Sequence, residues 1–374
     1  LSGGSASVGP GLRMRGGGGA GAQLGERTVV WQGTGPASRL TLQGVSFQQA
    51  ASLLLSGQGQ VTLRNTTFAD TLLLAPTPSS IPESCSSPST MLLGGAAVLI
   101  LGPLSPASAL RVQVQENCLF RNNSVSGPGV VGGGAILFLG QRCRFQPPPG
   151  VEWSLSIQDT QFVDNAMEWP TNTVPLPFPA PSSGPRVFGG GAVASFANTT
   201  TIGCSFLGNR VQGVQLGPAG GGALAVAATW TSTNSTFVGN TVEGILTGRG
   251  VARIGNMTTT ASASGGGAVW MLGEGSIQGG EFSGNVFRDS LLGPFLETLL
   301  SGPPGQSGGG ALMVATSGGG NNFAFILNCA FKDNAVYNVG NVDRSVLDLL
   351  EELLEGACLF VILLLFLVIG EKYS

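Results

Sequence analysis

The chain contains a short recurring stretch, and one complete copy reads Gly189-Gly190-Gly191-Ala192-Val193-Ala194-Ser195-Phe196, closed by Phe206-Leu207-Gly208-Asn209. The first half, glycines followed by alanine and apolar residues, ends at Ala96, Ala135, Ala192, Ala223, Ala268 and Ala311. The second half, Phe-x-x-Asn, lies at Phe120/Asn123, Phe162/Asn165, Phe206/Asn209, Phe237/Asn240, Phe282/Asn285 and Phe331/Asn334. Because the two halves alternate six times, they predict an internal structural repeat.

The spacing between the two halves shows where the repeat tolerates extra residues. Alanine and phenylalanine are 14 residues apart in three successive copies, and the shortest whole repeat, from Ala192 to Ala223, takes 31 residues. The longer copies contain Pro-rich insertions, such as 146–149, 169–185 and 287–305. Strands of fixed length joined by variable loops are typical of stacked coils.

Each part of the motif has a physical role in such a coil. The glycines permit positive φ and close approach between coils, and the apolar residues after them fill the interior of the next strand. The phenylalanines are expected to stack as an aromatic ladder, and the asparagines as a ladder of side-chain amides. The residue before each asparagine position is one that tolerates left-handed geometry, which predicts a turn at Asp70, Asn122, Asp164, Gly208, Gly239, Gly284 and Asp333.

Two alternating segments upstream, 40–47 and 61–68, predict further half-buried strands. Their phenylalanines, Phe47 and Phe68, are 21 residues apart, which fits one short coil. The sequence therefore predicts an all-β parallel solenoid of about eight coils over residues 28–341. Residues 1–27 are Gly-rich and are expected to form a loose leader or an incomplete first coil.

The residue two positions before each phenylalanine is small in every coil: Thr66, Cys118, Thr160, Cys204, Ser235, Gly280 and Cys329. Since neighbouring coils lie about 4.8 Å apart, Cys118 and Cys204 are expected roughly 9–10 Å apart, beyond the reach of a disulfide. These cysteines are therefore predicted to fill the core. Cys85 and Cys143 lie in insertions, where pairing between them stays open.

The paired Gly-Gly-Ala and Phe-x-x-Asn motifs resemble the repeats of chlamydial polymorphic outer membrane proteins. Similar repeats occur in right-handed parallel β-helix proteins of the pectin-lyase-like superfamily. The resemblance covers about residues 90–336 and, less closely, 38–71. It implies a right-handed parallel β-helix and, in the chlamydial case, a surface-displayed adhesin with a C-terminal autotransporter β-barrel. This chain ends differently.

The pattern changes after Asn341. Residues 342–356 have leucines at helical spacing among acidic residues, which indicates an amphipathic helical linker. Residues 357–370 are apolar, and the 18 residues from Leu353 to Gly370 would span about 27 Å as a helix. We expect a transmembrane anchor here, with Lys372 favouring a cytoplasmic C-terminus and an extracytoplasmic solenoid. The alternative is a helix that caps the solenoid; a lipid-anchor signal fits poorly with Glu371 and Lys372.

Five Asn-x-Ser/Thr sequons fit an extracytoplasmic surface protein that carries N-linked glycans. They lie at Asn65, Asn122, Asn198, Asn234 and Asn256. Ser and Thr beside Asn also suit the packing of a solenoid, so the sequons support this localisation without deciding it.

Composition excludes several classes of function. The chain of 374 residues has no histidine, which removes histidine general bases, Ser/Cys-His catalysis and most zinc chemistry. A net charge of -3 without a basic face argues against nucleic acid as a partner. No Gly-Lys-Ser/Thr follows the glycine tracts, so they do not predict a phosphate-binding loop. We expect no cofactor and no metal.

The best catalytic candidates are Asp159, Asp164 and Glu168, near Glu152. The positions equivalent to Asp159 in other coils are Gly203, Asn234 and Gly279, so no stacked carboxylates are expected. The sequence favours a non-catalytic, membrane-anchored cell-surface solenoid that presents a binding or adhesive surface to a glycan or protein. The alternatives are a polysaccharide lyase or hydrolase with a site in the insertions, and a repeat fragment without independent function.

Overall fold

The protein was analysed as a computed structural model. It describes residues 5–8, 13–15, 28–48, 51–74, 94–126, 132–140, 147–169, 189–216, 220–247, 252–254, 257–259, 263–289, 306–314 and 324–338. Every element in these ranges is a β-strand. The chain divides into two compact units, Leu1–Tyr337 and Asn338–Ser374. The helices predicted over 342–356 and 357–370 lie outside the described residues, as do Cys85, Cys143 and Asn256.

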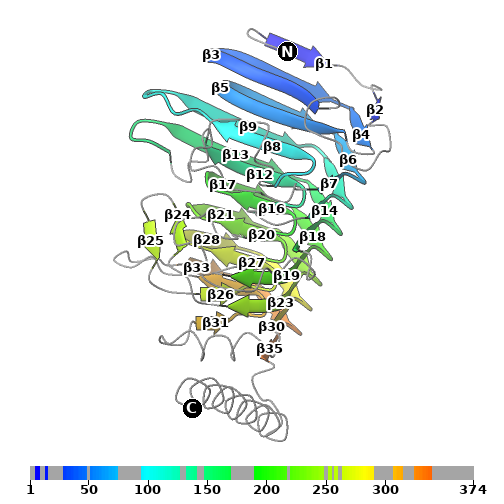
Figure 1. Cartoon of the computed structure of the whole chain (residues 1–374), viewed down its shortest axis with the longest axis vertical. Coiled ribbons are helices and arrows are strands. Elements are labelled where there is room, and N and C mark those ends of the chain that lie inside the picture. The colour runs from blue at the N-terminus through cyan, green and yellow to red at the C-terminus, as the bar shows by residue number, and fades with distance from the viewer. Residues whose placement is uncertain are drawn as a thin grey trace, which may run out of the picture. The chain divides into compact units, whose positions relative to one another are not determined.

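The first unit is a parallel solenoid whose coils contribute to three sheets, labelled here A, B and C (Figure 1). One complete coil consists of β8 (Val98–Gly102) and β9 (Ala109–Gln115) in sheet A, β10 (Leu119–Arg121) in sheet B and β11 (Ser124–Ser126) in sheet C. Sheet B has nine strands, one from each successive coil, and β2 begins it. The prediction of about eight coils is therefore confirmed.

The other coils repeat this path. Their strands are β12 (Ile136–Gly140), β13 (Glu152–Gln158), β14 (Gln161–Val163) and β15 (Ala166–Trp169); β16 (Val193–Ser195), β17 (Asn198–Ile202), β18 (Ser205–Leu207) and β19 (Arg210–Leu216); β20 (Leu224–Val226), β21 (Trp230–Thr233), β22 (Thr236–Val238) and β23 (Thr241–Thr247); β27 (Val269–Met271), β28 (Gly275–Gln278), β29 (Glu281–Ser283) and β30 (Val286–Asp289); β32 (Leu312–Val314), β33 (Ala324–Leu327), β34 (Ala330–Lys332) and β35 (Ala335–Asn338). Between coils lie β24 (Ala252–Ile254) and β25 (Met257–Thr259), which pair antiparallel, and β26 (Ala263–Gly265) and β31 (Gln306–Gly308), which pair parallel.

The N-terminal coils differ because their strands in sheet A are long. β3 (Thr28–Gln43) pairs along its length with β5 (Ser52–Arg64), and β5 then pairs with both β8 and β9. From there each coil crosses sheet A as two separate strands. β4 (Ser46–Gln48), β6 (Thr67–Ala69) and β7 (Leu72–Leu74) complete these coils. β1 (Ser5–Val8) pairs with β3, and β2 (Arg13–Arg15) pairs with β4.

The predicted aromatic ladder is present. Eight phenylalanine rings stack through sheet B with centroids 4.4 to 5.0 Å apart and planes within 12° of parallel. They are Phe47, Phe68, Phe120, Phe162, Phe206, Phe237, Phe282 and Phe331. Close parallel stacking of this kind adds to the burial of apolar area that stabilises each coil against the next.

The asparagine ladder is also present, and its members are hydrogen bonded from coil to coil. Asn209 Nδ2 donates to Asn240 Oδ1 at 3.0 Å in the next coil and to the Phe162 carbonyl at 3.0 Å in the preceding one. Its Oδ1 accepts from both N–H and Nδ2 of Asn165. The same bonds recur from Asn123 to Asn334. Because five of the six side chains are completely buried, the ladder satisfies polar groups that water cannot reach.

The turn after the phenylalanine is left-handed at all seven predicted positions, from Asp70 to Asp333. Asp164 (φ 54°), Gly208 (φ 61°) and Gly239 (φ 62°) occupy the turn after the phenylalanine in three successive coils. We refer to the bend formed by the motif glycines before each alanine as the glycine corner. In the corner of one coil, Gly190 has φ 81°, and a Cβ there would lie 2.1 Å from the Val193 carbonyl oxygen. Glycine at this corner is therefore required by both conformation and space.

The predicted alignment of the first motif copy, which placed Ala96 at the motif alanine, was wrong by one residue. Gly94 pairs with Gly132, and Ala97 pairs with Ala135, so Ala96 occupies the place of the third glycine rather than of the motif alanine. The sequence did not reveal this shift, because alanine fits both the position of the third glycine and that of the motif alanine.

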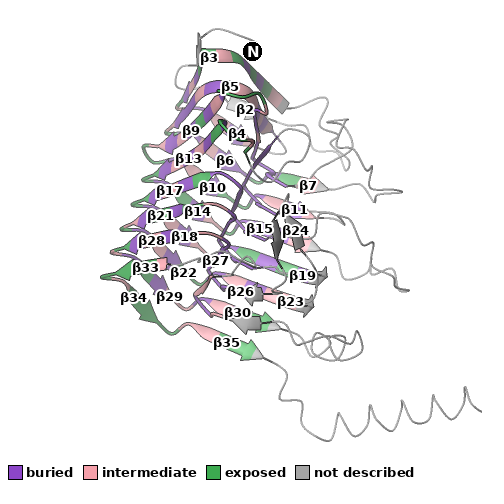
Figure 2. Cartoon of the chain, turned by 90° about the vertical axis from the view of Figure 1, so that its left-hand side faces the viewer, coloured by how far each residue is buried: buried purple, intermediate pink, exposed green. Residues whose placement is uncertain are grey.

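The apolar residues that follow the glycine corner belong to two buried clusters rather than one. On β12, Ile136 and Phe138 belong to the interior core, whereas Leu137 and Leu139 belong to a second buried cluster with Ala194, Ala225 and Trp270. Strands that are buried on both faces have nearly continuous apolar sequences. Figure 2 shows this burial (purple) along the successive coils. The expectation that these residues all fill the interior is therefore corrected.

Candidate functional site

The structure separates the predicted catalytic carboxylates. Asp159 (φ 47°) and Asp164 (φ 54°) form the left-handed turns at opposite ends of β14. Glu168, on β15, forms an ion pair with Arg210 at 2.6 Å, and Glu152, at the start of β13, pairs with Arg111 at 2.8 Å. In the part of the chain that the structure describes, no group of three or more acidic or cysteine side chains is placed to hold a metal ion.

A polar face covers the outer side of sheet A over its second column of strands. Its centre is a column of hydroxyl and amide side chains, one from each of six successive coils and in register. The members are Thr62, Gln113, Ser156, Thr200, Thr231 and Ser276, and we refer to them as the hydroxyl column. Their neighbours along each strand, such as Leu155 and Ile157, point into the core. Alternation along each strand points these polar side chains outward, and the spacing between neighbouring strands places them about 4.8 Å apart.

The N-terminal part of this face is held by side-chain interactions between coils. Gln113 Oε1 accepts from Gln60 Nε2 at 3.0 Å and from Thr62 Oγ1 at 3.4 Å. At the edges, Arg111 pairs with Glu152, and Arg64 with Glu116 at 3.5 Å. In each of these exposed ion pairs the arginine and the glutamate carry opposite charges. The residues of the hydroxyl column between them carry no charge. An uncharged array of donors and acceptors suits a ligand that is itself rich in hydroxyl groups.

The hydroxyl column ends at the last coil, where the outward residues become apolar. Ser276 pairs with Phe325, and Gln278 with Leu327. Phe325 is 62% exposed and Leu327 58% exposed. The residues equivalent to Phe325 in earlier coils are the hydroxyls and the amide of the hydroxyl column. The polar face therefore borders an apolar edge on β33.

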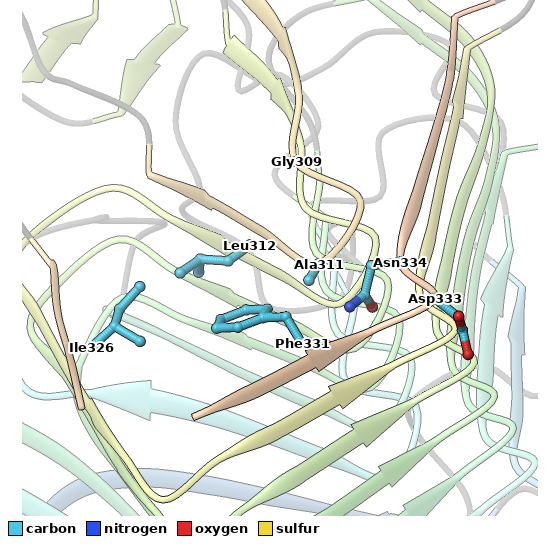
Figure 3. A pocket seen from close by; sticks show the side chains of 7 residues that line it. All are labelled: Gly309, Ala311, Leu312, Ile326, Phe331, Asp333 and Asn334. Atoms are coloured by element: carbon cyan, nitrogen blue, oxygen red, sulfur yellow. The ribbon is translucent and has the colours of Figure 1, made fainter. Parts of the chain in front are cut away.

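Among the described residues no further coil follows β32 to β35, and we refer to this end of the solenoid as the open end. It forms a shallow pocket (Figure 3). Its lining residues are Gly309, Ala311, Leu312, Ile326, Phe331, Asp333 and Asn334. The side chains of Leu312, Ile326 and Phe331 converge there, and the Asp333 carboxylate points away. The Phe331 ring stacks on Phe282 at 4.9 Å on one side and is 47% exposed. The exposed strands β33 and β34 form this end in Figure 2.

The small residues beside the phenylalanine ladder are buried, as predicted, except in the last described coil, where Cys329 is half-buried. Cys118 and Cys204 are free thiols in separate coils, and each Sγ contacts backbone carbonyl groups. Burial raises the pKa of the Cys204 thiol to about 11, and it also raises the pKa of Cys118. Both thiols are therefore protonated core residues rather than nucleophiles.

Four of the five sequon asparagines lie at the surface. Asn65, Asn122 and Asn234 are exposed at left-handed turns, and Asn198 is exposed at the start of β17, on an edge of the polar face. The Asn122 amide donates to Asp70 Oδ1 at 3.1 Å. Exposure leaves these positions accessible for glycan attachment.

Sequence reasoning missed the residues that form the polar face and the open end. Thr200 and Thr231 lie in strands whose inward positions are also polar, namely Thr199, Thr201 and Ser232. Alternation of apolar and polar residues therefore could not separate the two sides there. The signal that could have found the face is register with β13, where Ser156 lies between the apolar Leu155 and Ile157.

No helix among the described residues is long and apolar enough to span a membrane. Comparison of the chain with protein-family models, curated proteins and solved structures gave no match.

Proposed function

We propose that this protein is a non-catalytic cell-surface β-solenoid whose polar face binds a glycan. The observation that carries the proposal is the in-register hydroxyl column from Thr62 to Ser276. Hydroxyl and amide groups both donate and accept hydrogen bonds, so a row of them can follow the hydroxyl groups of an extended sugar chain. A protein ligand is the other partner class, and the binding test separates the two.

The location of the carboxylates supports a binding role over hydrolysis or elimination. Asp159 and Asp164 form turns, and Glu152 and Glu168 are in ion pairs with arginines. A glycosidase places two carboxyl groups on either side of one glycosidic bond. Within the described ranges, these four groups are distributed over two turns and two strands instead.

The test compares two pairs of hydroxyl groups from the same two coils. Thr200→Ala with Thr231→Ala removes two members of the hydroxyl column, whereas Ser205→Ala with Thr236→Ala removes a matched pair on sheet B. We expect the first double variant to weaken binding to an array of immobilised glycans at least tenfold, and the second to leave it unchanged. Asn198 lies at the edge of the polar face, so the assay includes enzymatically deglycosylated protein.

Three results would contradict this function. They are equal effects of the two double variants, binding of proteins but no glycans by the unmodified chain, and release of shorter sugars from a polysaccharide. The last result would favour the lyase or hydrolase alternative, and Asp159→Ala would then locate its site.

The surface location and the family relationship are parts of the same proposal. Residues 357–370 would anchor the chain in a membrane with the solenoid outside, and the exposed sequons at Asn65, Asn122, Asn198 and Asn234 fit that side of the membrane. Deleting 357–370 should move the protein from the membrane fraction to the soluble fraction. The right-handed coiling and the kinship with chlamydial polymorphic outer membrane proteins rest on the repeat motifs.

A further inference from the structure

Among the described residues, the hydrogen-bond donors at the end of the asparagine ladder have no matching acceptor. In the preceding coil, the backbone N–H and Nδ2 of Asn285 both donate to Asn334 Oδ1, at 3.0 and 2.8 Å. Asn334 has the same two groups, and its Nδ2 makes one bond, to the Phe282 carbonyl at 2.8 Å. No described residue supplies the next Oδ1. The end therefore offers two donors directed at one oxygen atom.

Apolar groups surround these donors. Phe331 is 47% exposed, and Ile326 is 44% exposed although the corresponding Ile277 is completely buried. On β35, Val336 and Tyr337 are 41% and 51% exposed. In the preceding coil, the residues equivalent to Phe331, Ile326 and Val336 are the completely buried Phe282, Ile277 and Phe287. Exposed strand edges with apolar side chains favour the addition of another strand.

We propose that the open end binds an extended strand from another protein, in which an aromatic residue is followed three positions later by asparagine. The aromatic ring would stack on Phe331, and the asparagine oxygen would accept from the N–H and Nδ2 of Asn334. This is the interface that the solenoid already forms between successive coils, from Phe120 and Asn123 onward. The occupant is thus defined by continuity with that interface.

The ladder itself argues against a second copy of this chain as the occupant. A two-fold dimer through this end would place the Asn334 donors of one copy against the same donors of the other. A head-to-tail copy would present β2, in which Met14 pairs with Phe47, and the sequence three positions after Met14 has Gly17 rather than asparagine. Neither arrangement supplies an amide oxygen. The proposal concerns the end of the solenoid and does not depend on the function proposed for the polar face.

The test uses the full chain and a synthetic peptide of residues 275–289, which contains Phe282 and Asn285. We expect the fluorescently labelled peptide to bind, as measured by fluorescence anisotropy. A peptide with leucine in place of Asn285 should bind at least tenfold more weakly, as should one with serine in place of Phe282. These comparisons need no change in the protein.

Protein variants then locate the site. Phe331→Glu should weaken binding of the parent peptide at least tenfold, and Thr236→Ala, on the same sheet but away from the end, should not. Circular dichroism checks that both variants keep their fold. Absence of peptide binding, or equal binding of the leucine peptide, would overturn the proposal.

Two further results would assign the end to a different occupant and would also overturn it. The first is a dimer in sedimentation that Phe331→Glu dissociates. The second is peptide binding that is seen only after removal of residues 339–374.

Discussion

Asn209 illustrates how much of the stack depends on one buried side chain. Its amide joins three coils through four hydrogen bonds, and it is completely buried. Asn209→Ala would leave the N–H and Nδ2 of Asn165 and the Phe162 carbonyl without these partners. We expect the free energy of unfolding to fall by about 3–5 kcal/mol, because each buried unsatisfied group costs about 1–3 kcal/mol.

Urea unfolding followed by circular dichroism measures this loss. Asn198→Ala is the matched control, since Asn198 is an exposed asparagine in the same coil, and it should change stability by less than about 0.5 kcal/mol. Similar losses for both variants would show that the ladder does not stabilise the core.

The Cys204 thiol gives a second prediction at this scale. Its pKa rises to about 11 in the folded protein, mainly because burial disfavours the thiolate. Between pH 9 and pH 11 the unfolded chain loses this proton while the folded chain retains it, so stability falls as pH rises through that window. The slope of unfolding free energy against pH should be shallower in Cys204→Ala, and an unchanged slope would contradict this assignment.

Alkylation checks the same residue at neutral pH. Iodoacetamide followed by peptide mass spectrometry should label Cys204 after unfolding but not in the native protein. Cys329, in the last described coil, is the residue for comparison. It is only half-buried and should react sooner than Cys204.

The glycine corner is the element that sets the direction of each coil. In Gly190→Ala the new Cβ would meet the Val193 carbonyl and the backbone would keep a positive φ, so we expect a loss of about 2–5 kcal/mol. Gly239 also has a positive φ but has open space around it. Gly239→Ala should cost about 1–2 kcal/mol, and Gly239→Asn less, because asparagine tolerates this conformation. Equal losses at the two glycines would contradict a role for close approach between coils.

Repetition explains which elements could be predicted from the sequence. The same residue types recur at the phenylalanine and asparagine positions of successive coils. Their spacing and simple steric arguments therefore predict the stacked rings, the left-handed turns and the cysteines in the core. The second buried cluster around Leu137 and Trp270 could not be predicted, because a continuous apolar run does not reveal which residues face inward. The open end depends on which coil comes last, which no single repeat encodes.

At the scale of the whole molecule, coils behave as interchangeable units because each contacts mainly its neighbours. Deleting the 31 residues 192–222 joins Gly191 to Ala223 and removes one coil between two glycine corners. Phe162 would then stack on Phe237, and Asn165 would bond to Asn240. We expect a folded protein with unchanged circular dichroism per residue and a slightly lower melting temperature. Deleting 192–206 removes only half a coil and should prevent folding; comparable stability of the two variants would contradict the repeat boundaries.

The parallel pairing of successive coils also determines how the molecule responds to tension. Each coil is joined to the next by rows of hydrogen bonds along three sheets. A pull on the chain beyond β35 loads the outermost row from one end, so bonds break one after another rather than together. The shortest coil, of 31 residues, would add about 100 Å of extended chain when released, and the longer coils would add more. Under load the protein would lengthen coil by coil at low force, dissipating the work of stretching while the remaining coils stay folded.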